Sequence, residues 1–154
     1  MSAERRAEGR SDRRRVARGG RRGHDRSGRH PTVLVAESYA AARSPYVRYL
    51  DRFNFHVEQA SDGEQALTLI NATPPHVILI ERDLPLLSAG RLSQWLAQNW
   101  RTRHIPIIVL AGSIPLPPGS EPPTEGMAGV LLKPFQLTEM LDEIRRVLRV
   151  QPNS

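Results

Sequence analysis

The chain has 154 residues, of which 39% are hydrophobic, and a formal net charge of +6, so it can form one domain of ordinary size with a buried core. It contains no cysteine, which excludes a disulfide framework, cysteine-ligated zinc and thiol catalysis and suits a reducing compartment such as the cytoplasm. Its apolar runs reach about five residues against the ~20 that span a bilayer, and no signal-peptide pattern is visible, so we expect no membrane partner.

The first 30 residues differ sharply from the rest in composition. They hold 11 arginines against four acidic residues, a net charge of +7, whereas residues 31–154 hold 11 basic and 12 acidic residues. Val16 is their only branched aliphatic residue and they contain no aromatic residue, so they cannot bury enough surface to offset the entropy of ordering. We predict a disordered arm over residues 1–30. The arm could bind nucleic acid through its phosphates, or be a solvated tail or an upstream extension.

From Pro31 onward, short apolar runs alternate with amphipathic stretches, a pattern typical of βαβ units and a parallel sheet. Residues 32–36 are expected to form the first buried strand. The helix that follows has one apolar face, formed by Tyr46, Tyr49, Leu50 and Phe53. Pro45 leaves the start of this helix open, because Ser44 could cap it with Pro45 in the first turn, or Pro45 could lie inside a helix that begins near Ser38.

The middle of the chain continues the alternation. Residues 55–59 indicate a weaker strand, and residues 61–64 (Ser-Asp-Gly-Glu) have the spacing of a capping box at the start of a second helix. Pro74-Pro75 ends that helix. Residues 76–81 are the clearest buried strand, and a third helix is expected from Ser88 to Trp100. Within it, Trp95 and Trp100 are interpreted as core and rim positions.

The last third of the folded region is expected to supply two strands, at 105–110 and 129–132, and a final amphipathic helix at 137–149. Residues 113–124, between those strands, include five prolines, and each would cost a helix interior ~3 kcal/mol or more. We therefore predict an extended or irregular connection in place of a fourth helix. Residues 151–154 form a short tail.

Lys133 is the single lysine of a chain whose other 21 basic residues are arginine. It follows an apolar run and precedes Pro134-Phe135, so a short buried strand is expected to deliver an ammonium group at its carboxyl end. Lysine carries a compact charge on a flexible stem, without the planar fork of arginine, and the exception points to a small polar pocket. A solvated strand end is the alternative.

These features together resemble the receiver domain of bacterial response regulators over residues 31–150. The features are Asp62-Gly63 at the start of the second helix, an acid four residues before Pro85, and Lys133-Pro134-Phe135. The resemblance implies an α/β, flavodoxin-like fold. Its five-stranded parallel sheet has the order 2-1-3-4-5 with flanking helices, and its site lies beyond the carboxyl ends of the strands.

In that family a histidine kinase transfers a phosphoryl group to an aspartate that ends the third strand. Two acids after the first strand help to hold Mg²⁺, while a Ser or Thr ending the fourth strand and a Lys ending the fifth contact the phosphoryl group. The resemblance places Glu81 at the phosphoacceptor position and Ala36 and Glu37 at the acidic pair. It places Ala111 at the hydroxyl position, and only Lys133 matches the pattern.

The departures weaken phosphotransfer chemistry. Glu81 carries its carboxylate one methylene further out than aspartate, and a misplacement of about 1 Å can cost ~100-fold in rate. Because Ala36 removes one acid, Glu37 and Glu81 would hold Mg²⁺ weakly or not at all. Ala111 offers no hydroxyl. We interpret Glu81 as a fixed partner of Lys133 that partly imitates a phosphorylated aspartate.

Asp83 is the second carboxylate of the acidic pocket and an alternative acceptor. It lies only two residues before Pro85 and beyond the apolar run, so we expect a solvated loop residue or a supplier of a backbone carbonyl. Residual phosphotransfer at Glu81 or Asp83 stays open as an alternative function.

The leading hypothesis is a stand-alone, degenerate (pseudo-receiver) domain that is not an enzyme and needs no cofactor. It would act in phosphorelay-type signal transduction in the cytoplasm by docking to a protein partner, a histidine kinase or another signalling protein. Nucleic-acid association through residues 1–30 is a third possibility. The five histidines show no metal-ligand spacing.

Overall fold

The computed structural model describes residues 30–112 and 126–149. The arm predicted for residues 1–30 lies outside these ranges apart from His30, and the tail at 151–154 lies wholly outside them. The proline-rich connection predicted for 113–124 is likewise outside the described residues.

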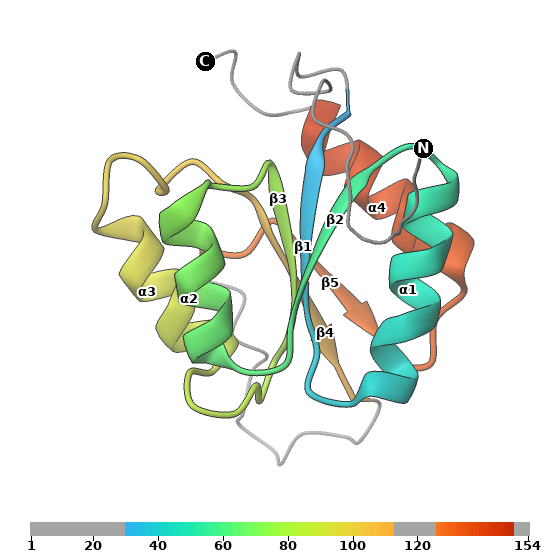
Figure 1. Ribbon diagram of the computed structural model, residues 1–154, viewed down its shortest axis with the longest axis horizontal. Coiled ribbons are helices and arrows are strands. Elements are labelled where there is room, and N and C mark those ends of the chain that lie inside the picture. Colours follow the sequence, from blue (N-terminus) through green and yellow to red (C-terminus); the bar gives the residue numbers. More distant parts are fainter. Residues whose placement is uncertain (1–29, 113–125, 150–154) are drawn as a thin grey trace, which may run out of the picture. The chain divides into compact units, whose positions relative to one another are not determined.

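Five parallel strands form a single sheet with the order β2-β1-β3-β4-β5, which confirms the predicted fold class (Figure 1). The strands are β1 (Thr32–Ala36), β2 (His56–Ala60), β3 (Val77–Glu81), β4 (Ile107–Ala111) and β5 (Gly129–Leu132). β1, β3 and β4 are buried along nearly their whole length, which explains their continuous Val, Ile and Leu runs. Because all five strands run the same way, their carboxyl ends meet at one edge of the sheet.

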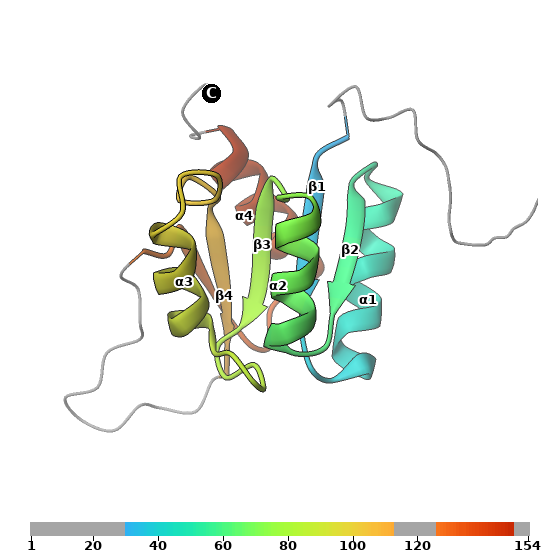
Figure 2. The same cartoon turned by 60° about the vertical axis from the view of Figure 1, so that its left-hand side comes forward.

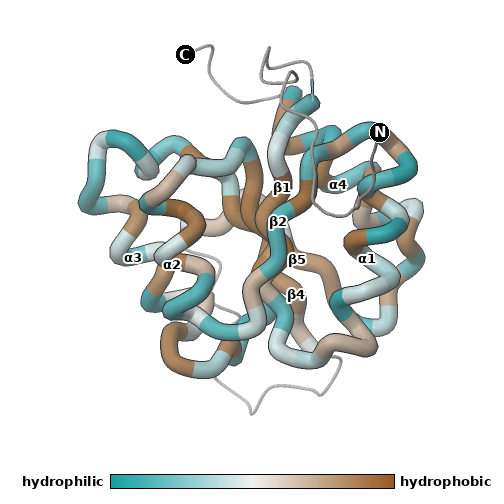
Figure 3. The backbone as a smooth tube through the Cα atoms, in the orientation of Figure 1, coloured by the Kyte–Doolittle hydropathy of each residue, from teal (hydrophilic) through white to brown (hydrophobic). Residues whose placement is uncertain are grey.

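Four helices flank the sheet within the described part of the chain: α1 (Ala40–Arg52), α2 (Gly63–Ala72), α3 (Ala89–Ala97) and α4 (Leu137–Arg149). α1 and α4 cover one face, and α2 and α3 cover the other (Figures 1 and 2). The alternation of each strand sends its apolar side chains into two cores, one on each face. Figure 3 shows hydrophobic residues gathered along the central strands. None of the four helices is long and apolar enough to cross a bilayer.

α1 begins at Ala40, so Pro45 lies inside the helix, and the alternative in which Ser44 caps it is wrong. Tyr39 occupies the N-cap position but provides no side-chain hydrogen bond. Arg43 fastens the first turn instead: its Nη1 donates to the carbonyl of Glu37 at 2.7 Å and its Nε donates to Gln59 Oε1 at 3.0 Å.

α2 begins one residue later than the predicted capping box implies, because the box would place the N-cap at Ser61. Asp62 is the N-cap, and its Oδ1 accepts a hydrogen bond from the backbone N–H of Gln65 at 2.8 Å. Gln65 Oε1 in turn accepts from the N–H of Ser61 at 2.8 Å, so the reciprocal partner is Gln65 and not Glu64.

α3 ends at Ala97, before the predicted end at Trp100. A buried Thr102 stops it: the Thr102 hydroxyl donates to the carbonyl of Leu96 at 2.9 Å. The residues between form a tight loop that returns the chain to β4, and Trp100 is left 75% exposed.

Glu58, on the edge strand β2, is the one described side chain with a buried polar atom that has no hydrogen-bond partner. Burial raises the pKa of this carboxyl. A carboxyl with a raised folded-state pKa favours the fold most below its unfolded pKa, and this contribution is lost as the pH rises through the folded pKa.

We therefore expect Glu58→Gln to stabilise the protein by about 1 kcal/mol at neutral pH, at the low end for an unpaired buried polar atom because the side chain is partly exposed. Urea unfolding at several pH values would measure the difference, which should shrink as the pH falls toward 4.5, the ordinary pKa of the group. Glu64→Gln, on an exposed position of α2, is the matched control and should bring no such gain. A gain that does not depend on pH would contradict the explanation.

Candidate functional site

A cluster of charged side chains lies at the carboxyl edge of the sheet, where β1, β3 and β5 end. Lys133 Nζ donates to Glu37 Oε1 at 2.7 Å. The predicted direct pair between Glu81 and Lys133 is therefore wrong. Glu81 belongs to the same cluster, since its charge acts on Lys133, but its hydrogen bonds go to Ser38.

Lys133 pairs with Glu37 rather than with Glu81 because Glu37 is the more deeply buried of the two carboxylates. Its residue is only 1% exposed, directly after β1, and its N–H donates to the carbonyl of Ala60 at 3.0 Å. Lys133 is aimed by β5, where its own N–H donates to the carbonyl of Ala111 at 2.8 Å. The second oxygen, Glu37 Oε2, accepts from the N–H of Tyr39 at 3.3 Å, so both carboxylate oxygens have partners.

Glu81 is held by Ser38, a residue that the sequence analysis missed. Glu81 Oε1 accepts from the Ser38 N–H at 2.9 Å and from its hydroxyl at 2.8 Å. Burial acts to raise the pKa of Glu81. Its two hydrogen bonds from Ser38 act in the opposite direction, as do a hydrogen bond with Glu37 and the charge of Lys133. Together they outweigh burial, so the pKa is lowered. The only signal in the sequence was a hydroxyl directly after Glu37 in the β1–α1 loop.

The ammonium group of Lys133 is also perturbed. Burial acts to lower its pKa, but the hydrogen bond and charge of Glu37, with smaller effects from Tyr46 and Glu81, raise it overall. Tyr46 borders the cluster from α1, and its ring stacks on Phe135 with centroids 5.3 Å apart. Burial, together with Glu37 and Glu81, raises the pKa of the Tyr46 phenol, against an opposing effect of Lys133. The sequence analysis treated Tyr46 only as part of a helix face.

The other predicted site positions contribute no oxygen or lie elsewhere. Ala36 is fully buried and Ala111 is 5% exposed at the end of β4, and both side chains are methyl groups. Asp83 is an exposed loop residue whose Oδ2 pairs with Arg82 Nη2 at 2.9 Å. Its assignment to the acidic pocket is corrected, because its carboxylate faces Arg82 in the loop and the pocket carboxylates are Glu37 and Glu81.

The side chains present do not fit a divalent cation as they stand. Glu37 is neutralised by Lys133, Glu81 Oε1 is engaged by Ser38, and Ala36 supplies no ligand. Among the residues that the structure describes, no group of three or more His, Asp or Glu side chains could hold a metal ion. Mg²⁺ needs oxygen ligands that are free to coordinate it.

The family of this chain follows from a match of the response regulator receiver domain model to residues 33–145. The chain belongs to the response regulator receiver domain family, whose members act in two-component signalling. A solved response regulator from Chloroflexus aurantiacus aligns with a TM-score of 0.72 over 79% of this chain and 99% of that one, at 21% identity. The chemotaxis response regulator CheY4 of Vibrio cholerae aligns with a TM-score of 0.69 over 77% and 98%, at 22% identity. These two likenesses show the fold alone.

Among curated proteins, the chain is 27% identical over 77% of its length to the DNA-binding dual master transcriptional regulator RpaA of Synechocystis, covering 49% of that protein. It is 29% identical over 76% of its length to the response regulator MprA of Mycolicibacterium vanbaalenii, covering 50% of that protein. The chain thus spans about half the length of these relatives.

Proposed function

We propose that this chain is a degenerate receiver domain that acts as a protein-interaction module without switching by phosphorylation. The observation that carries the proposal is the hydrogen-bonded pair between Lys133 and the buried Glu37. The cation that would meet an incoming phosphoryl group already has a carboxylate partner.

Phosphoryl transfer needs a carboxylate in line with phosphorus and positive charge around the equatorial oxygens. Here Ser38 holds Glu81 through two hydrogen bonds to Oε1, which fixes the orientation of the carboxylate, and that orientation would have to suit in-line attack by the other oxygen. A modification shifts a conformational equilibrium only through contacts that differ between two states, and the methyl group of Ala111 can make no hydrogen bond to a phosphoryl oxygen.

The protein as it stands should remain unmodified when it is incubated with acetyl phosphate and Mg²⁺. A variant with Ala36→Asp, Glu81→Asp and Ala111→Thr restores the missing oxygens and the shorter acceptor, and it should gain the mass of one phosphoryl group. Intact-mass spectrometry measures both, and circular dichroism checks that the variant is folded.

A labelled natural chain would overturn the proposal in favour of residual phosphotransfer. Peptide mapping would then distinguish Glu81 from Asp83, and Asp83→Ala is the matched control because Asp83 is exposed and pairs with Arg82 in the loop. A folded triple variant that stays unlabelled would show that these three positions do not account for the loss.

The partner that we propose is a protein of a two-component pathway in the cytoplasm. The relatives of this chain include sensor histidine kinases, such as TmoS of Ectopseudomonas mendocina, and response regulators. In this proposal the cluster at the carboxyl edge holds one surface shape permanently, and recognition depends on that shape rather than on a phosphoryl group.

A further inference from the structure

The stretch of chain around α3 has an unusual charge pattern. From Leu84 to Gly112 it contains three arginines, Arg91, Arg101 and Arg103, and no acidic residue. The neighbouring stretch 66–80, which includes most of α2, also lacks acids. The positive charge of this surface therefore has no local compensation in the sequence.

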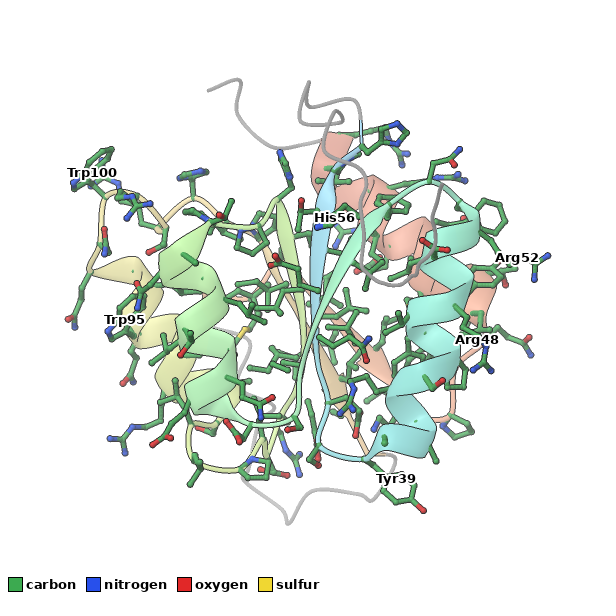
Figure 4. The ribbon with its side chains drawn as sticks, viewed as in Figure 1. Tyr39, Arg48, Arg52, His56, Trp95 and Trp100 are labelled. Atoms are coloured by element: carbon green, nitrogen blue, oxygen red, sulfur yellow. The ribbon has the colours of Figure 1, made fainter. Side chains whose placement is uncertain are left out.

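Trp100 lies in the loop between α3 and β4 and is 75% exposed, more than any other large hydrophobic side chain among the described residues. Exposing an indole ring costs hydrophobic free energy, and large exposed aromatic surfaces commonly mark binding sites. Trp95 is half-buried on α3, where it packs against the edge of the core, and Figure 4 shows Trp100 projecting outward from the loop that follows.

The loop presents its side chains from a firmly held backbone. Thr102 is buried, with its hydroxyl donating to Leu96 O at 2.9 Å, while the Arg103 N–H donates to Asn99 O at 2.9 Å. The Arg101 N–H donates to Asn99 Oδ1 at 3.0 Å. Burial of Thr102 forces its two neighbours outward, and both Arg101 and Arg103 are exposed.

Two arginines of the described fold are held by acids, whereas Arg101 and Arg103, like most of the others, are not. Arg82 pairs with Asp83 and Arg146 pairs with Glu143. Within the described ranges, the guanidinium groups of Arg101 and Arg103 form no ion pair with an acid. Two guanidinium groups that follow an exposed indole in the same loop can bind phosphates with bidentate geometry while the ring stacks on a base.

We propose that Trp100, Arg101 and Arg103, with Trp95 and Arg91 along α3, form a binding surface for single-stranded nucleic acid. Trp100 stacks on a base, and Arg101 and Arg103 contact the flanking phosphates. The flat exposed ring favours nucleic acid over an acidic protein, which would need the charge but not the stacking surface.

The test uses the full chain and an oligothymidylate of about 12 nucleotides, within the site sizes of such platforms. We expect binding to quench tryptophan fluorescence, and Trp100→Leu to weaken binding roughly 10-fold and to remove most of the quenching. Trp100→Phe keeps a ring that stacks and should retain more of the affinity than the leucine variant.

Two matched double variants separate the contribution of the arginine charges to binding from that of base stacking on Trp100. Arg101→Gln with Arg103→Gln should reduce the slope of log affinity against log salt by about 1.4, or ~0.7 for each phosphate contact. Arg48→Gln with Arg52→Gln removes the same charge from exposed positions of α1, on the opposite side of the sheet (Figure 4), and should leave the slope unchanged.

Equal slopes for the two double variants, or quenching that does not depend on Trp100, would overturn the proposal and assign binding to residues 1–30 alone. Binding of poly-L-glutamate, at the same total charge as the oligonucleotide, tests whether the surface binds an acidic protein instead of nucleic acid. If it binds as tightly as the oligonucleotide and depends equally on Trp100, the surface is a protein-docking site and the proposal is wrong.

Discussion

Replacing Gly63 by alanine is expected to destabilise the fold by about 3 kcal/mol or more, because the added methyl group has no space. Gly63 is the first residue of α2 and is buried. A Cβ at this position would overlap Leu87 Cβ and lie 2.7 Å from the Leu87 nitrogen and 2.8 Å from its Cα. The obstacle is backbone, which cannot rotate out of the way as a side chain can.

The same contact connects two loops at the carboxyl edge. The Gly63 N–H donates to the carbonyl of Pro85 at 2.8 Å, which ties the start of α2 to the loop that follows β3 and Glu81. In that loop Leu86 adopts a left-handed backbone with φ of 71° and is 69% exposed, a conformation that is strained for a side chain of this size. Pushing Leu87 away would therefore disturb the loop next to the charged cluster.

Urea unfolding of Gly63→Ala against Gly90→Ala measures the effect. Gly90 lies in α3 and a Cβ there meets nothing within 4 Å, so alanine should stabilise the protein by about 0.5–1 kcal/mol through helix propensity. Opposite signs for the two variants are expected. A Gly63→Ala protein as stable as the natural chain would show that the loop yields to the added methyl group.

The sheet could be predicted from the sequence because local patterns carry it. The central strands are buried on both faces, so they appear as unbroken apolar runs, and the helices appear as apolar stripes of helical period. Element ends were less predictable where long-range contacts decide them. α3 ends at Ala97 because of the hydrogen bond from Thr102 to Leu96, and α1 continues through Pro45, which local rules alone did not settle.

The site could be predicted in its location but not in its pairing. The strand ends and the resemblance to receiver domains placed Glu37, Glu81 and Lys133 at one edge, where the structure brings them together. Which carboxylate binds the lysine depends on burial and side-chain direction, which the one-dimensional pattern does not contain. The capture of Glu81 by Ser38 depends in the same way on the shape of the β1–α1 loop.

Lys133→Met should destabilise the protein by roughly 2–3 kcal/mol, because it leaves the carboxylate of Glu37 buried without its cation. This loss is smaller than the ~3–5 kcal/mol typical of breaking a fully buried ion pair, because the Lys133 side chain is 30% exposed. Glu37→Gln should cost less, because the lysine that it leaves unpaired can reach solvent. The double variant should recover part of the loss, since neither unpaired charge remains.

The pH dependence gives an independent check. The raised pKa of Lys133 means that its contribution is fully present below the ordinary value of 10.5 and is lost as the pH rises through the folded-state pKa. Urea unfolding should therefore show an alkaline loss of stability in the natural chain that is smaller in Lys133→Met. The control is Asp83→Ala, which breaks an exposed pair and should change stability little at any pH.

A double-mutant cycle in which the effects of Glu37→Gln and Lys133→Met simply add would contradict the pairing and, with it, the argument against switching. In that case the coupling energy between Lys133 and Glu37 would be negligible, and Glu81 rather than the lysine would have to account for any loss of phosphotransfer. A clear coupling energy between positions 37 and 133, together with no labelling by acetyl phosphate, would instead indicate that one interaction accounts for both results. The interaction that stabilises the carboxyl edge is then the same one that keeps the cation from a phosphoryl group.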